Sequence, residues 1–279
     1  MKREQAVILL IGAALCFSLG GVLIKWVDWN PIAIAGARSG IAAVLVYFAF
    51  PRMRITWSFY QLAGAGAYTA NMLCFVVANK MTTAANAVVL QYSAPAWVAL
   101  FSAWFLRERI RRSDWLAITL VTGGIFLFFM DKLTLTGFWG NLWAVASGFS
   151  YAWVFLFFRR QKEDVPYGSL FLGNALTGLI CIPFMFQGMP GPQGILGLLL
   201  LGVVQIGVAY SLYSIAIRHV TALDASIILL LEPLLNPVWT FLVLGEVPGS
   251  WAILGALIIL GAITLQTALP YVREKKESG

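Results

Sequence analysis

Long apolar runs, separated by short polar or charged segments, recur along the whole chain of 279 residues. A helix needs about 20 predominantly apolar residues to span a bilayer. Runs such as ILGLLLLGVV (195–204) do not alternate apolar and polar positions, as strands of a membrane barrel would. We therefore predict an all-α integral membrane protein. Its ten predicted transmembrane helices cover residues 5–26, 31–50, 57–79, 83–106, 113–130, 138–158, 167–187, 194–217, 221–244 and 249–270.

The composition supports a membrane protein. Hydrophobic residues make up 60% of the chain and charged residues only 11%, whereas soluble domains average roughly 25% charged residues. A water-soluble fold leaves too much surface in water to hide this apolar content. The N-terminal MKREQAVILLIGAALCFSLGG begins like a signal peptide, but its apolar run continues to about Trp26. We expect an uncleaved first span there.

The basic residues define the orientation of the spans. With the N-terminus inside, the inside segments carry fifteen basic residues, and the outside connections carry only Lys25, Lys80 and Lys132. This asymmetry follows the positive-inside rule and predicts that both termini are cytoplasmic. The net charge of +7 is therefore a topology signal rather than a sign of nucleic-acid binding.

Two segments of the chain repeat each other at a constant offset of 138 residues. KMTTAANAVVLQYSAPAWVALFSAWFLRE (80–108) aligns with RHVTALDASIILLLEPLLNPVWTFLVLGE (218–246), so that Thr83 meets Thr221, Pro95 meets Pro233 and Glu108 meets Glu246. The repeat predicts two halves of five helices each, residues 1–132 and 133–279. Because five is odd, the second half is inverted, as is typical of secondary transporters with a midplane substrate site.

Several of these motifs resemble a known family. The fourth helix of each half contains a proline and ends in FLRER or VLGEV, spans one and six share A-x-x-F-S (AALCFS, VASGFS), and span nine carries LEP…GE. In these features the chain resembles the ten-span EamA-type exporters of the drug/metabolite transporter superfamily. The resemblance covers residues 5–270 and implies outward transport of amino acids, other small metabolites or drugs.

Glu232 is the main candidate for substrate chemistry. It lies about eleven residues into span nine and so near the bilayer centre, where a carboxylate is costly and usually faces a cavity, a partner or water. The first repeat has Ala94 at the equivalent position. On a continuous helix one side carries Asp224, Ala225, Ile228, Glu232, Asn236 and Trp239. Glu232 either binds a cationic substrate group or a proton, or braces the helix as a neutral, hydrogen-bonded carboxyl group.

Three prolines and one arginine within the predicted spans are further candidates for a functional role. Pro95, Pro233 and Pro237 each remove a helix hydrogen bond and clash with the preceding turn. They are candidate hinges for alternating access, or tolerated kinks in packed helices. Arg38, seven residues inside span two, either extends its side chain to the surface or meets an anionic group such as a carboxylate.

Aromatic and amide side chains lie near the middle of several spans, away from the interfaces where aromatic belts normally occur. Each could serve packing alone, but the set suits a pocket for a small ligand with an apolar or ammonium part. The helices concerned line the cavity in the family that the chain resembles. The candidates are Tyr68, Asn71, Gln91, Tyr92, Tyr151, Trp153, Gln205, Tyr210 and Tyr213.

The sequence lacks the motifs expected of a membrane enzyme, a channel or a transporter of phosphorylated substrates. A membrane enzyme needs a polar reaction centre, but the single histidine is His219, and the sequence has no metal-ligand spacing and no phosphate-binding loop. We expect no cofactor. No ring of channel filter residues is present, and phosphorylated substrates would want several cations where only Arg38 is available. Glu108 and Glu246 are expected to be solvated or capping charges.

The sequence thus predicts a secondary transporter of the bacterial inner membrane that moves amino acids or related amphipathic metabolites. Its expected partners are the small-molecule substrate, the lipid bilayer and, as a candidate coupling ion, the proton. An exporter of cationic drugs is the alternative within the transporter class.

Overall fold

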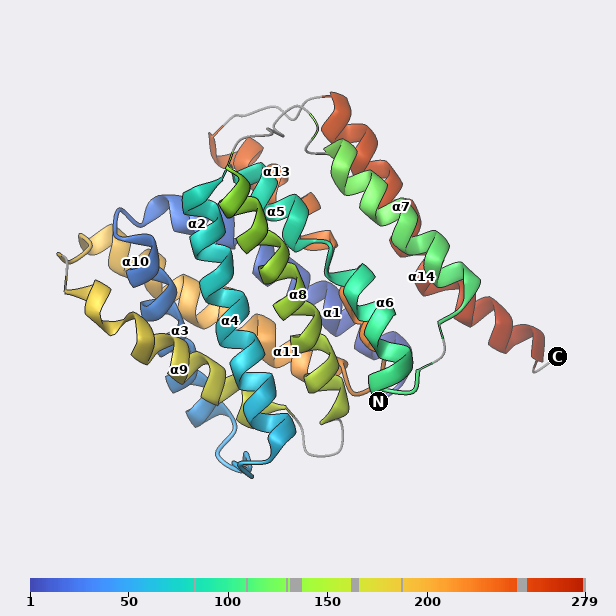
Figure 1. Cartoon of the computed structure of the whole chain (residues 1–279), viewed down its shortest axis with the longest axis horizontal. Helices are drawn as coiled ribbons and strands as arrows, with labels where there is room; N and C mark the ends of the chain where they lie inside the picture. Colours follow the sequence, from blue (N-terminus) through green and yellow to red (C-terminus); the bar gives the residue numbers. More distant parts are fainter. Residues whose placement is uncertain are drawn as a thin grey trace.

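The computed structural model describes residues 1–82, 84–108, 110–128, 130, 137–161, 166–186, 188–244 and 250–277. The regular elements of these residues are all helical (Figure 1). They are α1 (Arg3–Ser18), α2 (Gly20–Trp26), α3 (Pro31–Ala49), α4 (Phe59–Met81), α5 (Ala84–Gln91), α6 (Ala94–Phe105), α7 (Arg112–Phe128), α8 (Phe138–Arg160), α9 (Tyr167–Met185), α10 (Pro192–Leu200), the π-helix η2 (Leu201–Val208), α11 (Ala209–Ala216), α12 (Ala222–Ile228), α13 (Leu231–Leu244) and α14 (Ser250–Glu277).

Every predicted span coincides with helical structure, so the prediction of an all-α fold is confirmed. Within the described part of the chain, six segments are long and apolar enough to cross a membrane. These are Pro31–Ala49, Phe59–Ala78, Asn86–Phe105, Phe138–Arg160, Tyr167–Met185 and Pro192–Ala216. Three predicted spans are divided into two helices, α1 and α2, α5 and α6, and α12 and α13, and a fourth consists of α10, η2 and α11.

Local sequence explains where several helices begin. The Asn30 side chain accepts a hydrogen bond from the Ile32 amide at 2.9 Å, and Pro31 occupies the first turn, where its missing N–H is not needed. Thr221 likewise caps α12, because its hydroxyl accepts from the Asp224 amide at 3.0 Å. Such caps satisfy amide groups that have no partner within the helix.

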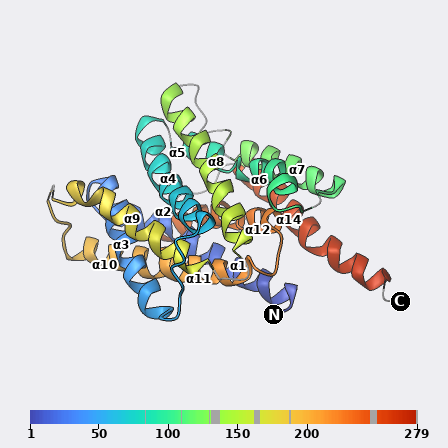
Figure 2. The same ribbon diagram turned by 60° about the horizontal axis from the view of Figure 1, so that its bottom comes forward.

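The first helix of each predicted half is embedded in the other half. Helix α1 packs against η2, α11, α12 and α13, and α8 packs against α4, α5 and α6. The remaining helices include two pairs that lie side by side, α3 with α9 and α7 with α14 (Figures 1 and 2). In each pair the two helices occupy equivalent positions of the predicted repeat.

The α7–α14 pair shows how small residues permit this packing. A Cβ atom at Gly255 would lie 2.5 Å from the Gly124 carbonyl oxygen, and one at Gly124 would lie 2.7 Å from the Ile259 side chain. Both glycines therefore allow the two backbones to approach each other more closely than side chains would permit. Figure 1 shows this pair along one edge of the molecule, with α14 extending beyond α7 to the C-terminus.

Candidate substrate site

Two helix breaks lie at equivalent positions of the repeat. Helix α5 ends at Gln91 and α6 begins at Ala94, while α12 ends at Ile228 and α13 begins at Leu231. Pro95 and Pro233 lie just after these breaks, as the proline rule predicts. Pro233 cannot donate to the Leu229 carbonyl, which instead accepts from the Glu232 amide at 3.0 Å. Pro95 and Pro233 thus coincide with full breaks in their helices rather than kinks.

The helix break in span nine shows that the prediction of one continuous polar stripe from Asp224 to Trp239 is wrong. Because α12 ends at Ile228, Asp224 belongs to a separate short helix and does not face Glu232 along one continuous surface. Its carboxylate instead lies 3.3 Å from Arg3 of α1, at the predicted cytoplasmic end. Helix α13 continues through Asn236 and Pro237, whose side chains lie outside the described residues.

Glu232 occupies the first turn of α13 and is partly buried. The Tyr92 hydroxyl, in the turn between α5 and α6, is the hydrogen-bond partner of its carboxyl group. Glu232 also interacts electrostatically with Tyr151, Tyr210 and Arg38. Glu232 of span nine therefore lies close to predicted site residues from four other spans.

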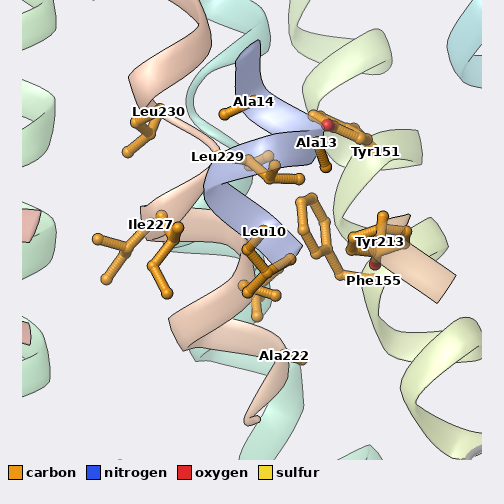
Figure 3. Packing of buried hydrophobic residues seen from close by; sticks show 14 of the residues in the cluster. Leu10, Ala13, Ala14, Tyr151, Phe155, Tyr213, Ala222, Ile227, Leu229 and Leu230 are labelled. Atoms are coloured by element: carbon orange, nitrogen blue, oxygen red, sulfur yellow. The ribbon is translucent and has the colours of Figure 1, made fainter. Parts of the chain in front are cut away.

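All five predicted tyrosines form one buried group, called here the tyrosine cluster: Tyr68, Tyr92, Tyr151, Tyr210 and Tyr213. The Tyr210 ring lies edge-on to Tyr68 at 4.9 Å and to Tyr213 at 6.0 Å between centroids. Figure 3 shows Tyr151 and Tyr213 with Phe155 on one side of α1, opposite Ile227 and Leu230. The tyrosine cluster thus joins α4, α8 and α11 beside α1.

Arg38 of α3 points into this region. It is only 7% exposed, so its side chain does not extend to the surface, which was one of the two alternatives. One guanidinium nitrogen donates to Gln205 Oε1 at 3.3 Å, and another approaches the Met72 sulfur at 3.8 Å. The Arg38 Nε atom is buried and has no hydrogen-bond partner among the described residues. The sequence identified Arg38 as a candidate because it is a charged residue within a span, but nothing in the sequence predicted its contact with Met72.

Gln205 lies in the π-helix η2, which interrupts the α-helical geometry of span eight. The segment packs closely on α3, since a Cβ atom at Gly202 would lie 3.0 Å from the Arg38 carbonyl oxygen. π-Helical turns within α-helices are rare and occur frequently at functional sites. Hydrophobic periodicity does not reveal such a turn, so the sequence predicted Gln205 but not its geometry.

Asn71 and Gln91 meet in a second polar group. The Gln91 amide donates to Asn71 Oδ1 at 3.1 Å and to the Ser147 hydroxyl at 2.9 Å, and Ser147 donates to Asn71 Oδ1 at 2.9 Å. Ser147 belongs to the VASGFS motif of α8 but was not predicted as a site residue. Next to it, a Cβ atom at Gly148 would lie 2.7 Å from the Gln91 carbonyl oxygen. This group ties α4 and α5 to α8 at the helix break.

The two predicted tryptophans lie elsewhere. Trp153 stands two positions after Tyr151 and so on the other face of α8, where its ring lies 5.3 Å from Phe101 and 5.1 Å from Phe157. It lines an apolar groove of about 350 Å³ together with Gly66, Ala67, Ala70, Phe149, Ser150 and Phe157. Trp239 donates from its indole nitrogen to the Ser18 hydroxyl at 2.8 Å, which links α13 to the A-x-x-F-S motif of α1.

A charged cluster joins the two predicted halves at their predicted cytoplasmic ends. Arg159 Nε lies 2.9 Å from Glu108 Oε1, and Arg159 Nη1 donates to the carbonyls of Ile217 at 3.0 Å and Arg218 at 2.7 Å. Glu108 Oε2 accepts from the Ala222 amide at 3.3 Å. Glu108 is therefore not simply solvated, because it caps α12 of the other half. Glu246 lies outside the described residues.

Comparison with known proteins identifies the family. A model of the EamA-like transporter family matches residues 5–130 and again residues 138–268. The chain belongs to the EamA-like transporter family. It is therefore a multi-pass membrane protein with two EamA domains, and a transporter rather than an enzyme.

Similar proteins are transporters as well. The pseudopaline exporter CntI of Pseudomonas aeruginosa is 29% identical over 273 residues, which cover 93% of this chain and 94% of that protein. The uncharacterized inner membrane transporter YicL of Salmonella typhimurium is 28% identical over 221 residues, 72% of this chain and 69% of that protein. A crystal structure with 19% identity covers 96% of this chain and 98% of its own, with a TM-score of 0.84, and supports the fold alone.

Proposed function

We propose that this EamA-family transporter exports small organic metabolites across the bacterial inner membrane, and that its substrates are amino acids or related amphipathic compounds. The similarity to the pseudopaline exporter CntI over nearly the whole chain supports export of a small metabolite. The similarity to the inner membrane transporter YicL supports the location. No step of this function needs a resident cofactor.

The proposed architecture consists of ten spans in two inverted halves, residues 1–132 and 133–279, with both termini cytoplasmic. The double match of the family model supports the two halves. The packing of α3 on α9 and of α7 on α14 supports a two-fold relation, because equivalent helices meet at such an axis. The reciprocal embedding of α1 and α8 agrees with it.

The observation that carries the proposal is the convergence of Glu232, Arg38 and the tyrosine cluster between the halves. These residues come from α3, α4, α8, α11, α13 and the α5–α6 turn, and the tyrosines are buried. Intramembrane ionisable residues commonly mark transport pathways, and a midplane site between repeats is typical of secondary transporters. We assign Glu232 to the binding of a substrate ammonium group or a coupling proton.

Alternating access requires the halves to separate on one side at a time. On the predicted cytoplasmic side, the Glu108–Arg159 cluster connects α12 and the loop before it to the end of α8. Opening toward the cytoplasm would have to break these contacts. The helix breaks at Pro95 and Pro233 are the proposed hinges, because backbone without regular helical bonding can rotate at low cost.

The test is flux through the purified protein in liposomes, with a panel of amino acids and cationic drugs, with and without a pH gradient. We expect at least one amino acid to move and Glu232→Gln to abolish or slow its transport. Glu4→Gln, which changes an exposed glutamate of α1, serves as the matched control. Normal transport by Glu232→Gln at every pH would refute the role of Glu232. Transport of cationic drugs alone would favour the drug-exporter alternative, to which a carboxylate with aromatic walls is also suited.

A further inference from the structure

Among the residues that the structure describes, Arg38 is a buried cation without an anion in direct contact. A guanidinium group keeps its proton in proteins, and charged groups inside a membrane normally pair with one another or with backbone carbonyls. Among the described side chains, Arg38 contacts only an amide oxygen at 3.3 Å and a thioether sulfur at 3.8 Å. Its Nε has no hydrogen-bond partner in the part of the chain that the structure describes. The site therefore has an unused capacity for an anionic acceptor.

The intramembrane carboxylate that interacts with Arg38, Glu232, does not fill this capacity. Arg38 and Glu232 interact electrostatically but form no direct ion pair with each other in the described structure. Glu232 is bound by Tyr92 instead. Both charged groups adjoin Tyr210 of the cluster, since Tyr210 interacts with Arg38 and with Glu232. A cation and an anion thus face one region and remain apart.

We propose that Arg38 is the carboxylate subsite and Glu232 the ammonium subsite for a zwitterionic substrate of the α-amino-acid type. This inference rests on the proposed transport function and narrows its substrate class. A zwitterion presents one anionic and one cationic group to the separated pair, and so supplies each charge with a partner without net charge transfer into the membrane. The guanidinium fork suits a planar carboxylate because it offers parallel N–H donors.

Other ligand classes fit these groups less well. A phosphate would place two negative charges beside Glu232 with one arginine to receive them, whereas phosphate sites usually gather several donors. A simple amine would leave Arg38 unpaired and add a second buried cation beside it. The surrounding tyrosine rings suit the apolar side chain of the substrate.

The structure also holds Arg38 in a defined position for this role. Gln205, the partner of one terminal nitrogen, comes from the π-helix η2, which packs against the α3 backbone at Gly202. Met72 of α4 contacts the other terminal nitrogen. Neither partner carries a charge, so the cation is positioned without being neutralised and stays available to a substrate carboxylate.

The experiment compares analogues that differ only in their charged groups. One set consists of leucine, leucinamide, isoamylamine and isocaproate, and the other of phenylalanine, phenylalaninamide, phenethylamine and hydrocinnamate. Uptake into liposomes is measured for wild type, Arg38→Gln, Glu232→Gln and the control Arg52→Gln, which changes an exposed arginine beyond the end of α3. Thermal unfolding of each variant reports whether it folds.

We expect wild type to prefer the amino acid of at least one set over its amide and amine. Arg38→Gln should raise the apparent KM for that amino acid at least about tenfold, as expected for the loss of one charge-assisted hydrogen bond. The weak signals of the amide and amine should stay unchanged. Glu232→Gln should impair the amino acid and leave the carboxylic acid unchanged. Arg52→Gln should behave as wild type.

A second variant keeps the test decisive if Arg38→Gln does not fold. Gln205→Glu would place a carboxylate at the atom that already accepts from Arg38, and this internal partner should block amino-acid transport while the protein stays as stable as wild type. The inference is overturned if Gln205→Glu transports amino acids normally, if Arg38→Gln affects all analogues equally, or if wild type prefers the amines. If wild type prefers the amines, the zwitterion subsites are refuted but the proposed transport function is retained. If wild type transports none of these compounds and nothing in the wider panel, the proposed function fails as well.

Discussion

The Glu108–Arg159 cluster allows a quantitative prediction about closure of the predicted cytoplasmic side. The side chains of Glu108 and Arg159 are 18% and 16% exposed, so water screens their interaction only in part. Glu108→Gln removes the charge and keeps the side-chain length, and it weakens both the 2.9 Å contact to Arg159 and the 3.3 Å bond from the Ala222 amide. Arg159 keeps its two bonds to the carbonyls of Ile217 and Arg218.

The expected cost follows from these contacts. A hydrogen bond to a charged group contributes about 1.5–3 kcal/mol, and partial exposure and the retained neutral acceptor reduce the loss to roughly 1–2 kcal/mol. A change of this size shifts the equilibrium toward opening by a factor of about 5–30. Amide hydrogen exchange measured by mass spectrometry in nanodiscs should therefore become faster by a similar factor in residues 217–228.

The same measurement contains its controls. Exchange in α3 and α10, which have no hydrogen bond or ion pair to the cluster among the described residues, should stay at the wild-type rate, and Glu4→Gln should leave residues 217–228 unaffected. Unchanged exchange in residues 217–228 of Glu108→Gln would refute the assignment of the cluster as a closing contact. Faster exchange in all helices would show general destabilisation and would refute it too.

Three further outcomes follow from particular contacts. Ser147→Ala should lower the free energy of unfolding by about 1–3 kcal/mol, because it leaves buried groups of Asn71 and Gln91 without their shared partner; Ser150→Ala, at a serine bonded only within its own helix, should change little in the same unfolding assay. Gly148→Ala should reduce thermal stability and transport together, since its Cβ atom would lie 2.7 Å from a carbonyl oxygen of the facing helix; a melting temperature equal to wild type would contradict this packing. Burial and the positive charges of the N-terminus and two nearby arginines lower the pKa of His219 below its ordinary 6.5. The unfolded chain therefore takes up a proton more readily than the folded protein, so stability is retained above pH 6.5 and falls as the pH drops below it. Melting curves at several pH values should show that His219→Asn loses less stability in acid than wild type does.

Much of the fold could be predicted because the bilayer imposes a simple rule. Backbone groups in hydrocarbon need internal partners, so each apolar run of sufficient length becomes a helix, and the predicted ranges agree with the observed helices. The prolines likewise predicted an interruption at equivalent places in the repeat. The sequence could not tell whether a proline would kink or fully break its helix, because this depends on which donor satisfies the released carbonyl, as the Glu232 amide does for the Leu229 carbonyl.

The sequence by itself therefore determined the helices, the membrane class, the repeat and the chemical types available at mid-span, including Glu232, Arg38 and the tyrosines. Only the tertiary structure decided which of these meet. Helical periodicity placed Asp224 and Glu232 on one face of a single helix. The break between α12 and α13 separates them, and Asp224 forms an ion pair with Arg3 instead. Arg38 is buried against Gln205 because α3 packs on the π-helix, and Trp153 faces away because it follows Tyr151 by two positions. Packing between distant helices, which no local pattern encodes, sets the surroundings of each charge.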